Sequence, residues 1–199
     1  MARLQALSAD SSPELKNYFD FFLGTLGFTP NSVLTMQRKP KLVQAFAQLN
    51  GAVMDPAGEV DLGLRRLIGH VASKAGGCLY CQAHTLLGAK NFGVSAEKLA
   101  AVWSYATSPL YTPAERAALD FALAAGSQPN AVTDASFADL QRYWSDTQIV
   151  EILAVVAMFG FLNRWNDSMA TALEAVPTEV ASRAAREAGA PEWSAGKHA

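Results

Sequence analysis

The chain is poor in charged residues, and it has no excess of positive charge. Only 17% of its 199 residues are charged, and 16 lysines and arginines against 18 acidic residues leave a net charge of −2. A nucleic-acid-binding protein of the usual kind needs basic residues to neutralise phosphates, so this balance argues against nucleic acid as a partner. So few charges also leave little to cover the surface of a monomer. We therefore expect apolar surface to be buried between the subunits of a homo-oligomer.

Long hydrophobic runs are also lacking. The longest apolar run, Ile152 to Leu162, has 11 residues, and a helix needs about 20 to cross a bilayer. The first ten residues contain no continuous apolar segment of the kind found in secretory signals. The sequence therefore predicts a cytoplasmic protein without a membrane partner.

Cysteine is scarce, and glycine and proline show no period. Two cysteines without a secretory signal do not make a disulfide scaffold, and they are more typical of a catalytic or metal site. The 14 glycines and 9 prolines follow no repeat, which excludes a collagen-like chain, and 50% hydrophobic residues exclude disorder. No linker rich in Gly, Ser or Pro divides the chain. We expect one domain over residues 1–199.

Helix signals dominate the chain, and strand signals are almost absent. The sequence Thr112-Pro113-Ala114-Glu115 combines an N-cap, a first-turn proline and a capping-box glutamate. Such signals predict a compact all-α domain of seven to nine helices, followed by a loose tail over 191–199. The expected helices are 11–26, 31–50 with a break near Pro40, 60–75, 78–92, 95–105, 112–126, one from 133 or 134, 145–175 and 180–188.

One stretch, GGCLYCQAHT over 76–85, carries chemistry. It contains both cysteines of the chain, Cys78 and Cys81, and one of its three histidines, His84. Residues three apart on a helix are surface neighbours, so Cys78 faces Cys81 and Cys81 faces His84. The glycine pair places Cys78 in the first turn, where free backbone amides favour a thiolate. Together these features predict a dithiol redox site with His84 as proton carrier.

Other readings of this stretch are weaker. A c-type haem needs a histidine directly after the second cysteine, where Gln82 stands. Structural zinc takes four ligands, and the stretch offers three on one helix, although His70 could supply a fourth. The cysteines could also simply pack in the core. Because no nicotinamide, flavin or haem motif is present, we expect no cofactor and no metal.

The stretch resembles a known family. Residues 78–85 (CLYCQAHT) and 93–97 (GVSAE), with 112–122 and 161–166, are similar to the alkylhydroperoxidase D and carboxymuconolactone decarboxylase family, in its peroxidase-related branch. The resemblance covers about 35–175. It implies an all-helical homo-oligomer in which a dithiol reduces a small hydroperoxide and a separate thiol reductant restores it. It further implies that Cys81 attacks the peroxide, Cys78 resolves the intermediate and His84 relays protons, whereas helix position favours Cys78 as the more acidic thiol.

The chain departs from that family pattern in its proton relay. The glutamate expected twelve residues before the first cysteine is Arg66 here, and no acid lies between Leu62 and Gly77. The histidine expected between the cysteines is Tyr80. We therefore expect a relay rebuilt from other parts, with His70, Tyr80 and Arg66 as candidate relay or pocket residues.

Two other functions fit the same sequence. A decarboxylase-type lyase would use His84 and an arginine as acid, base and carboxylate binder, and it would not need Cys78. A non-catalytic oligomer would use the cysteines only to sense redox state. A late polar cluster could be a pocket wall, an interface or a solvated face, and it comprises Asn163, Arg164, Asn166 and Asp167. The sequence gives no role to His198 in the tail.

Overall fold

The computed structural model describes residues 1–190 and 192–199, and it is all-helical over these residues. The all-α prediction is thus confirmed, with ten α-helices in place of the expected seven to nine. The helices are α1 (Lys16–Leu26), α2 (Asn31–Met36), α3 (Pro40–Val53), α4 (Leu62–Ala75), α5 (Leu79–Asn91), α6 (Ala96–Ala100), α7 (Pro113–Gly126), α8 (Asp134–Gln141), α9 (Asp146–Met169) and α10 (Ala175–Glu187). Short 3₁₀ turns span Ala9–Ser11, Pro13–Leu15, Ala101–Ser104 and Gly196–His198.

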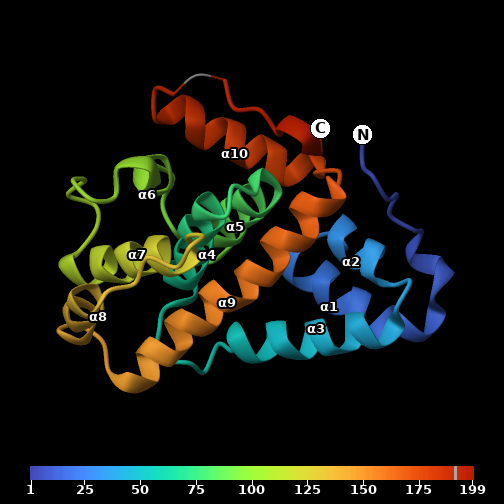
Figure 1. Ribbon diagram of the computed structural model, residues 1–199. Coiled ribbons are helices and arrows are strands. Elements are labelled where there is room, and N and C mark those ends of the chain that lie inside the picture. Colours follow the sequence, from blue (N-terminus) through green and yellow to red (C-terminus); the bar gives the residue numbers. More distant parts are fainter. Residues whose placement is uncertain (191) are drawn as a thin grey trace.

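Helix α4 forms the centre of the molecule and packs against α5, α7 and α9. The long helix α9 crosses the molecule diagonally, with α1 to α3 on one side and α6 to α8 on the other (Figure 1). Helix α10 packs against α5 and α6 and lies at the top of the same view. The close crossing of α4 and α9 needs Gly69, because a Cβ there would meet the Phe159 ring at 2.4 Å. This packing encloses the start of α5 between α4, α9 and α10.

The helix ends follow local capping rules. Thr112 and Glu115 form the predicted capping box of α7, and Ser145 and Gln148 form one for α9. Helix α3 begins at Pro40, as expected for a residue that cannot donate inside a helix. After α5, Gly93 has φ +85°, a left-handed conformation that glycine adopts without strain.

Three expected boundaries were wrong, and one of them is the start of the last helix, which lies at Ala175 and not at Val180. Ser11 and Glu14 form no capping box, because the chain makes two 3₁₀ turns first and α1 begins at Lys16. Helix α9 stops at Met169, well before 175, because Ala170 takes a left-handed φ of 45°.

The tail was expected to be loose, and over 192–199 it is not. The Leu173 amide donates to the His198 carbonyl at 2.8 Å, and the His198 side chain is buried. These contacts join the tail to the segment between α9 and α10. Pro191 lies outside the described residues.

Helix α9 is long and apolar enough to cross a membrane by length and composition alone. Of its most apolar window, 44% is buried inside the protein, where it packs against α3, α4, α5 and α7. Its apolar residues therefore supply much of the core that surrounds the start of α5.

A buried ion pair ties α4 to α9. The Arg65 side chain is 1% exposed and donates to the carbonyls of Val53 and Asp55, and its Nη2 lies 2.7 Å from Glu151 Oε2. Replacing Glu151 by alanine would leave the guanidinium buried without its carboxylate. We expect the free energy of unfolding in urea to fall by about 3 kcal/mol. Asp20→Ala, which breaks an exposed pair with Lys16, should cost less than about 1 kcal/mol. Equal losses in the two variants would contradict this account.

Candidate active site

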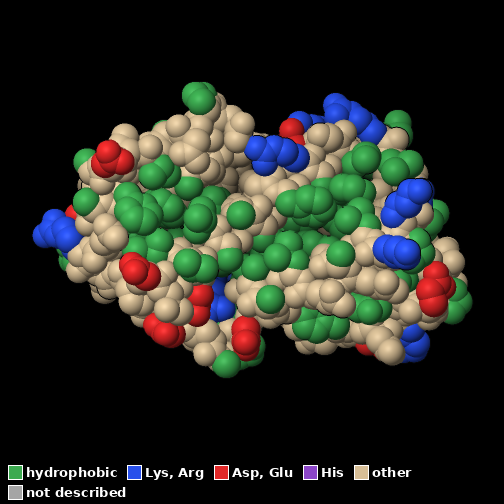
Figure 2. Space-filling view, turned by 60° about the horizontal axis from the view of Figure 1, so that its bottom comes forward, with side chains coloured by type: hydrophobic (Ala, Val, Ile, Leu, Met, Phe, Trp, Pro, Cys, Tyr) green, Lys and Arg blue, Asp and Glu red, His purple; other side chains and the backbone are tan. Residues whose placement is uncertain are grey.

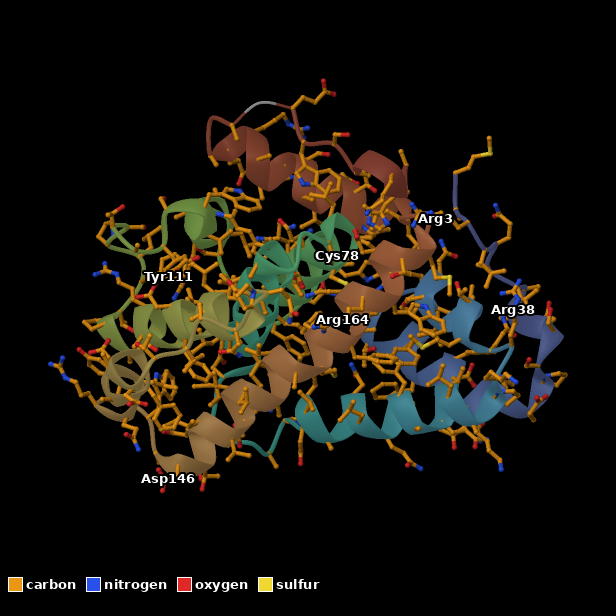
Figure 3. All side chains as sticks on the ribbon, in the orientation of Figure 1. Arg3, Arg38, Cys78, Tyr111, Asp146 and Arg164 are labelled. Atoms are coloured by element: carbon orange, nitrogen blue, oxygen red, sulfur yellow. The ribbon has the colours of Figure 1, made fainter. Side chains whose placement is uncertain are left out.

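The two cysteines meet at the first turn of α5. Gly77, with φ +71°, turns the chain after α4, and Cys78 becomes the N-cap of α5. The Cys78 sulfur accepts a hydrogen bond from the Cys81 amide at 3.5 Å, as a serine would at this position. Figure 3 shows Cys78 in the middle of the molecule, where α5 meets α9. Both thiols are reduced and buried.

The two thiols differ in pKa because their surroundings differ. The Cys81 thiol donates to the Cys78 sulfur, and this bond outweighs burial and lowers the pKa of Cys78 to about 6. Burial, together with the same donated bond, raises the pKa of Cys81 well above its usual value. The surroundings of the pair therefore favour a thiolate on Cys78 and a protonated thiol on Cys81.

Cys81 lines a cavity, and Cys78 lies behind it. The cavity lies between α1 to α5 and α9, and it has a volume of about 50 Å³. Its wall is mainly aromatic and aliphatic, with a few polar groups near Cys81. The apolar lining includes Phe22, Leu26, Val33, Phe46, Phe159 and Leu162, and the polar lining includes Asn50, Arg66, Tyr80, His84 and Asn166. An apolar pocket with few polar groups is typical of a site for a small organic molecule.

A carboxylate from the segment before α10 binds two of the polar residues that line this cavity. Glu174 Oε2 lies 2.7 Å from His84 Nε2, and Glu174 Oε1 accepts from the Tyr80 hydroxyl at 2.9 Å. The Asn31 amide also donates to Glu174, at 2.6 Å. Burial alone would raise the pKa of Glu174, but the nearby His84 and the hydrogen bonds outweigh it and lower the pKa. The Tyr80 and His84 rings stack at 4.3 Å. The fold therefore places a carboxylate, that of Glu174, beside His84, although segment 62–77 contains no acidic residue.

The other candidates from the sequence divide between wall and core. Arg66 lines the cavity, and burial lowers its pKa to about 10, which leaves it charged at neutral pH. His70 does not line the cavity. Its Nδ1 lies 3.0 Å from the Gln82 carbonyl and 3.1 Å from Thr85 Oγ1, and burial lowers its pKa to about 4. His70 is therefore a neutral structural residue.

Two residues of the late polar cluster reach the thiols from α9. The Asn166 side-chain amide donates to the Cys81 sulfur at 3.4 Å. Asp167 lies one residue further, and its carboxylate, a ring nitrogen of His198 and the Cys78 sulfur lie within 4.8 Å of one another. Asn163 instead donates to the Ala72 carbonyl, and Arg164 to that of Gly160.

That trio is the one grouping of three such donor atoms in the part of the chain that the structure describes. His70 is not one of these three residues. It therefore does not supply the fourth ligand of a structural zinc site, the role that the sequence allowed for it. We assign no metal to this grouping.

Comparisons with known proteins agree with this architecture. A family model described as the carboxymuconolactone decarboxylase family matches residues 40–124. The debrominase Bmp8 is 35% identical, with a TM-score of 0.86, over 91% of this chain and 97% of its own. A second Bmp8 structure, of a cysteine-to-alanine variant in complex with 2,3,4-tribromopyrrole, matches with the same score and identity over 91% of this chain and 96% of its own.

Two further relatives are more distant. An uncharacterized peroxidase-related protein from Ralstonia eutropha JMP134, with an alkylhydroperoxidase AhpD core, is 25% identical with a TM-score of 0.78, over 88% of this chain and 94% of its own. The uncharacterized protein YnjA of Escherichia coli (strain K12) is 30% identical over 92 residues, 46% of this chain and 50% of YnjA. The match thus spans about half the length of that curated relative. The family match, the fold and the likeness to Bmp8 over nearly its whole length show that the chain belongs to the alkylhydroperoxidase D and carboxymuconolactone decarboxylase family.

Proposed function

We propose that the chain is a dithiol oxidoreductase that reduces a small, largely apolar substrate in the cavity, with an alkyl hydroperoxide as the first candidate. The observation that carries the proposal is the arrangement of the thiols. Cys81 forms part of the cavity wall, and the acidic Cys78 lies directly behind it in hydrogen-bond contact. One thiol can meet the substrate while the other waits to form the disulfide.

The chemistry follows from the proton that the pair shares. Transfer of the Cys81 proton to Cys78 makes Cys81 the nucleophile. Its sulfur attacks the outer peroxide oxygen, the O–O bond breaks, and the alkoxide takes a proton to leave as the alcohol. Cys81 becomes a sulfenic acid. Cys78 then gives up the proton that it received, its thiolate attacks the sulfenic sulfur, and the hydroxyl leaves with a proton as water while the disulfide forms. A separate thiol reductant returns both cysteines to the reduced state.

Polar residues in the cavity wall can protonate the alkoxide leaving group. His84, held by Glu174, lines the same cavity as Cys81 and can hand a proton to the alkoxide. Arg66 adds a cation to the cavity wall, and Asn166 adds an amide donor at the Cys81 sulfur. These groups supply what a peroxidase relay needs from positions other than the usual ones.

A halogenated aromatic ring is the second candidate substrate. The aromatic lining of the cavity favours it, and so does the likeness to a debrominase over nearly the whole chain. The Cys81 thiolate would take the halogen from the ring carbon, which then takes a proton. Attack by Cys78 on the S–halogen bond would release halide and give the same disulfide. Both reactions consume two thiols for each substrate molecule.

The test is a free-thiol count with peptide mass analysis, before and after one equivalent of cumene hydroperoxide or of 2,3,4-tribromopyrrole. With one of these two compounds, we expect both free thiols to be lost within seconds. The peptide containing Cys78 and Cys81 should then carry an intramolecular disulfide. Bromide release identifies the halogenated substrate. Thiols that persist with both compounds would contradict the proposal, and turnover of a lactone or carboxylate that survives Cys78→Ser would establish the lyase instead.

We also propose that the protein assembles into a homo-oligomer. Figure 2 shows hydrophobic side chains over much of the face that lies at the bottom of Figure 1, where α3 and the first half of α9 lie. The exposed apolar residues of these helices are Leu49, Val150, Leu153 and Phe161. Apolar surface of this kind is typical of an interface between subunits.

Light scattering should give a mass of at least two chains, and Leu153→Glu should lower it, because a charge would be buried in the interface. Val176→Glu on α10, at the other end of the molecule, serves as the control. A wild-type mass of one chain, 21.2 kDa, would contradict the interface.

A further inference from the structure

The end of the chain folds back onto the redox pair. The turn Gly196–His198 lies against the end of α9 and the start of α5, and the His198 side chain is 1% exposed. Lys197 Nζ forms an ion pair with Asp167 Oδ2 at 2.7 Å, and the Leu173 amide donates to the His198 carbonyl. A tail with so many contacts has a fixed place in the fold.

The hydrogen bonds of His198 define its tautomer. Nδ1 lies 2.9 Å from the Thr171 carbonyl, which can only accept, so Nδ1 carries the proton. The free lone pair of the neutral ring is then on Nε2. This atom lies 3.7 Å from Asp167 Oδ1, and both atoms are buried without an ordinary hydrogen bond among the described residues. The Cys78 sulfur belongs to the same group within 4.8 Å. Because Nδ1 is engaged with Thr171, Nε2 is the ring nitrogen that is free to take a proton within this group, which also holds the Cys78 thiol and the Asp167 carboxylate.

We propose that His198 accepts the proton of Cys78, with Asp167 stabilising the imidazolium, so that the C-terminal turn supplies a positioned base for the redox pair. The step is a transfer of one proton from Cys78 Sγ to His198 Nε2, which gives a thiolate and an imidazolium. This inference rests on the proposed dithiol function for its role in turnover, although the proton transfer itself needs no substrate.

The electrostatics of the site agree with this geometry. Burial would lower the pKa of His198, but its contact with Cys78 and the nearby Asp167 outweigh burial and raise it. The same contact helps to lower the pKa of Cys78, after the larger contribution of the Cys81 thiol. Thiols paired with an imidazole at a helix start are those that ionise near neutral pH.

The arrangement separates two proton-handling groups. His84 lines the cavity, is held by Glu174 and serves the substrate, whereas His198 and Asp167 lie beside Cys78. Cys78 must be a thiolate when it attacks the oxidised Cys81, and a base on its own side allows this while the cavity holds the product.

The charged and titratable groups around Cys78 come from four segments. They are Tyr80 and Cys81 on α5, Asp167 on α9, Lys197 and His198 in the tail, and Arg3, which donates to the Ser168 carbonyl. A pH titration of Cys78 therefore needs variants that change one of these groups at a time.

The first experiment titrates the thiolate of Cys78 by its ultraviolet absorbance, in a Cys81→Ser background that leaves a single thiol. His198→Asn keeps an amide that can donate to the Thr171 carbonyl but removes Nε2. We expect its midpoint to lie about one pH unit or more above that of the background, so that the thiolate fraction falls about tenfold on the acid side. Glu192→Gln, an exposed change in the same tail, should leave the midpoint unchanged. An unchanged midpoint in His198→Asn, with the Leu173 amide still protected from hydrogen exchange, would overturn the proposal.

A second measurement needs no substitution and so remains decisive if His198→Asn releases the tail. The ring protons of His198 are titrated by NMR in the wild-type protein, with the cysteines reduced and then as a disulfide. We expect the midpoint to fall on oxidation, because the thiolate that raises the pKa of His198 is lost. An identical midpoint in both states would overturn the proposal. Neither measurement needs turnover, so thiols that persist with both the hydroperoxide and the halogenated pyrrole would refute the proposed function and leave this inference standing.

Discussion

Replacing Cys81 by serine should reduce turnover of the hydroperoxide by about 10³-fold or more, since the hydroxyl cannot take its place as a nucleophile at neutral pH. Cys81 is the thiol in the cavity wall, and no step of the proposed reaction proceeds without it. Cys78→Ser should behave differently. Its Cys81 can still be oxidised once, but the sulfenic acid has no thiol beside it and the reaction stops after one equivalent of substrate.

Single-turnover mixing with mass analysis distinguishes the two variants. Cys78→Ser should accumulate a sulfenic acid on Cys81, which dimedone captures, and Cys81→Ser should show no adduct at early times. Full activity in Cys81→Ser would show that Cys78 attacks the substrate. That result would favour the more acidic thiol over the one that lines the cavity. Limiting alkylation at neutral pH adds an independent check, because the small reagent reaches Cys81 through the cavity and should label it first.

The parts of this site that the sequence predicts are those made within one helical turn. The position of Cys78 at the helix start, its spacing to Cys81 and the position of His84 on the same helix depend on residues three or four apart, although Cys78 proved to be the N-cap and not a first-turn residue. Such contacts follow from helix geometry alone. The capping box at Thr112 and the helix start at Pro40 were predictable for the same reason.

The parts of the site that the sequence does not predict, Glu174 and the contacts of His198, depend on the unexpected end of α9 at Met169. Residues 145–175 have the pattern of a single long helix, and no Gly, Pro or Asn marks Ala170 as its end. Tertiary contacts stabilise the left-handed Ala170, since Arg3 and the tail both bind the segment that follows α9 or its last turn. The break turns Glu174 toward His84 and lets Thr171 bind His198. Pro177 lies in the first turn of α10, and it is the one local signal in the sequence that a new helix begins there.

Replacing Glu174 by glutamine should reduce kcat/KM for the hydroperoxide by about 10²-fold, the usual size of an acid–base contribution. Glutamine keeps the shape of the side chain and can still accept from the Asn31 amide. It removes the charge that holds His84 at 2.7 Å and orders the Tyr80 hydroxyl. Glu179→Gln, on the exposed face of α10, is the matched control and should leave kcat/KM unchanged.

The same substitution should change the acid dependence of stability. Because the pKa of Glu174 is lowered in the folded protein, its carboxylate stabilises the fold above the unfolded pKa, and this contribution is lost as pH falls through the folded value. The difference in unfolding free energy between wild type and Glu174→Gln should therefore be largest near neutral pH and shrink in acid. A double-mutant cycle with His84→Asn then assigns the effect. If Glu174 acts through His84, the double variant should be no slower than His84→Asn alone, whereas additive losses in kcat/KM would mean that Glu174 acts on the substrate by a route of its own.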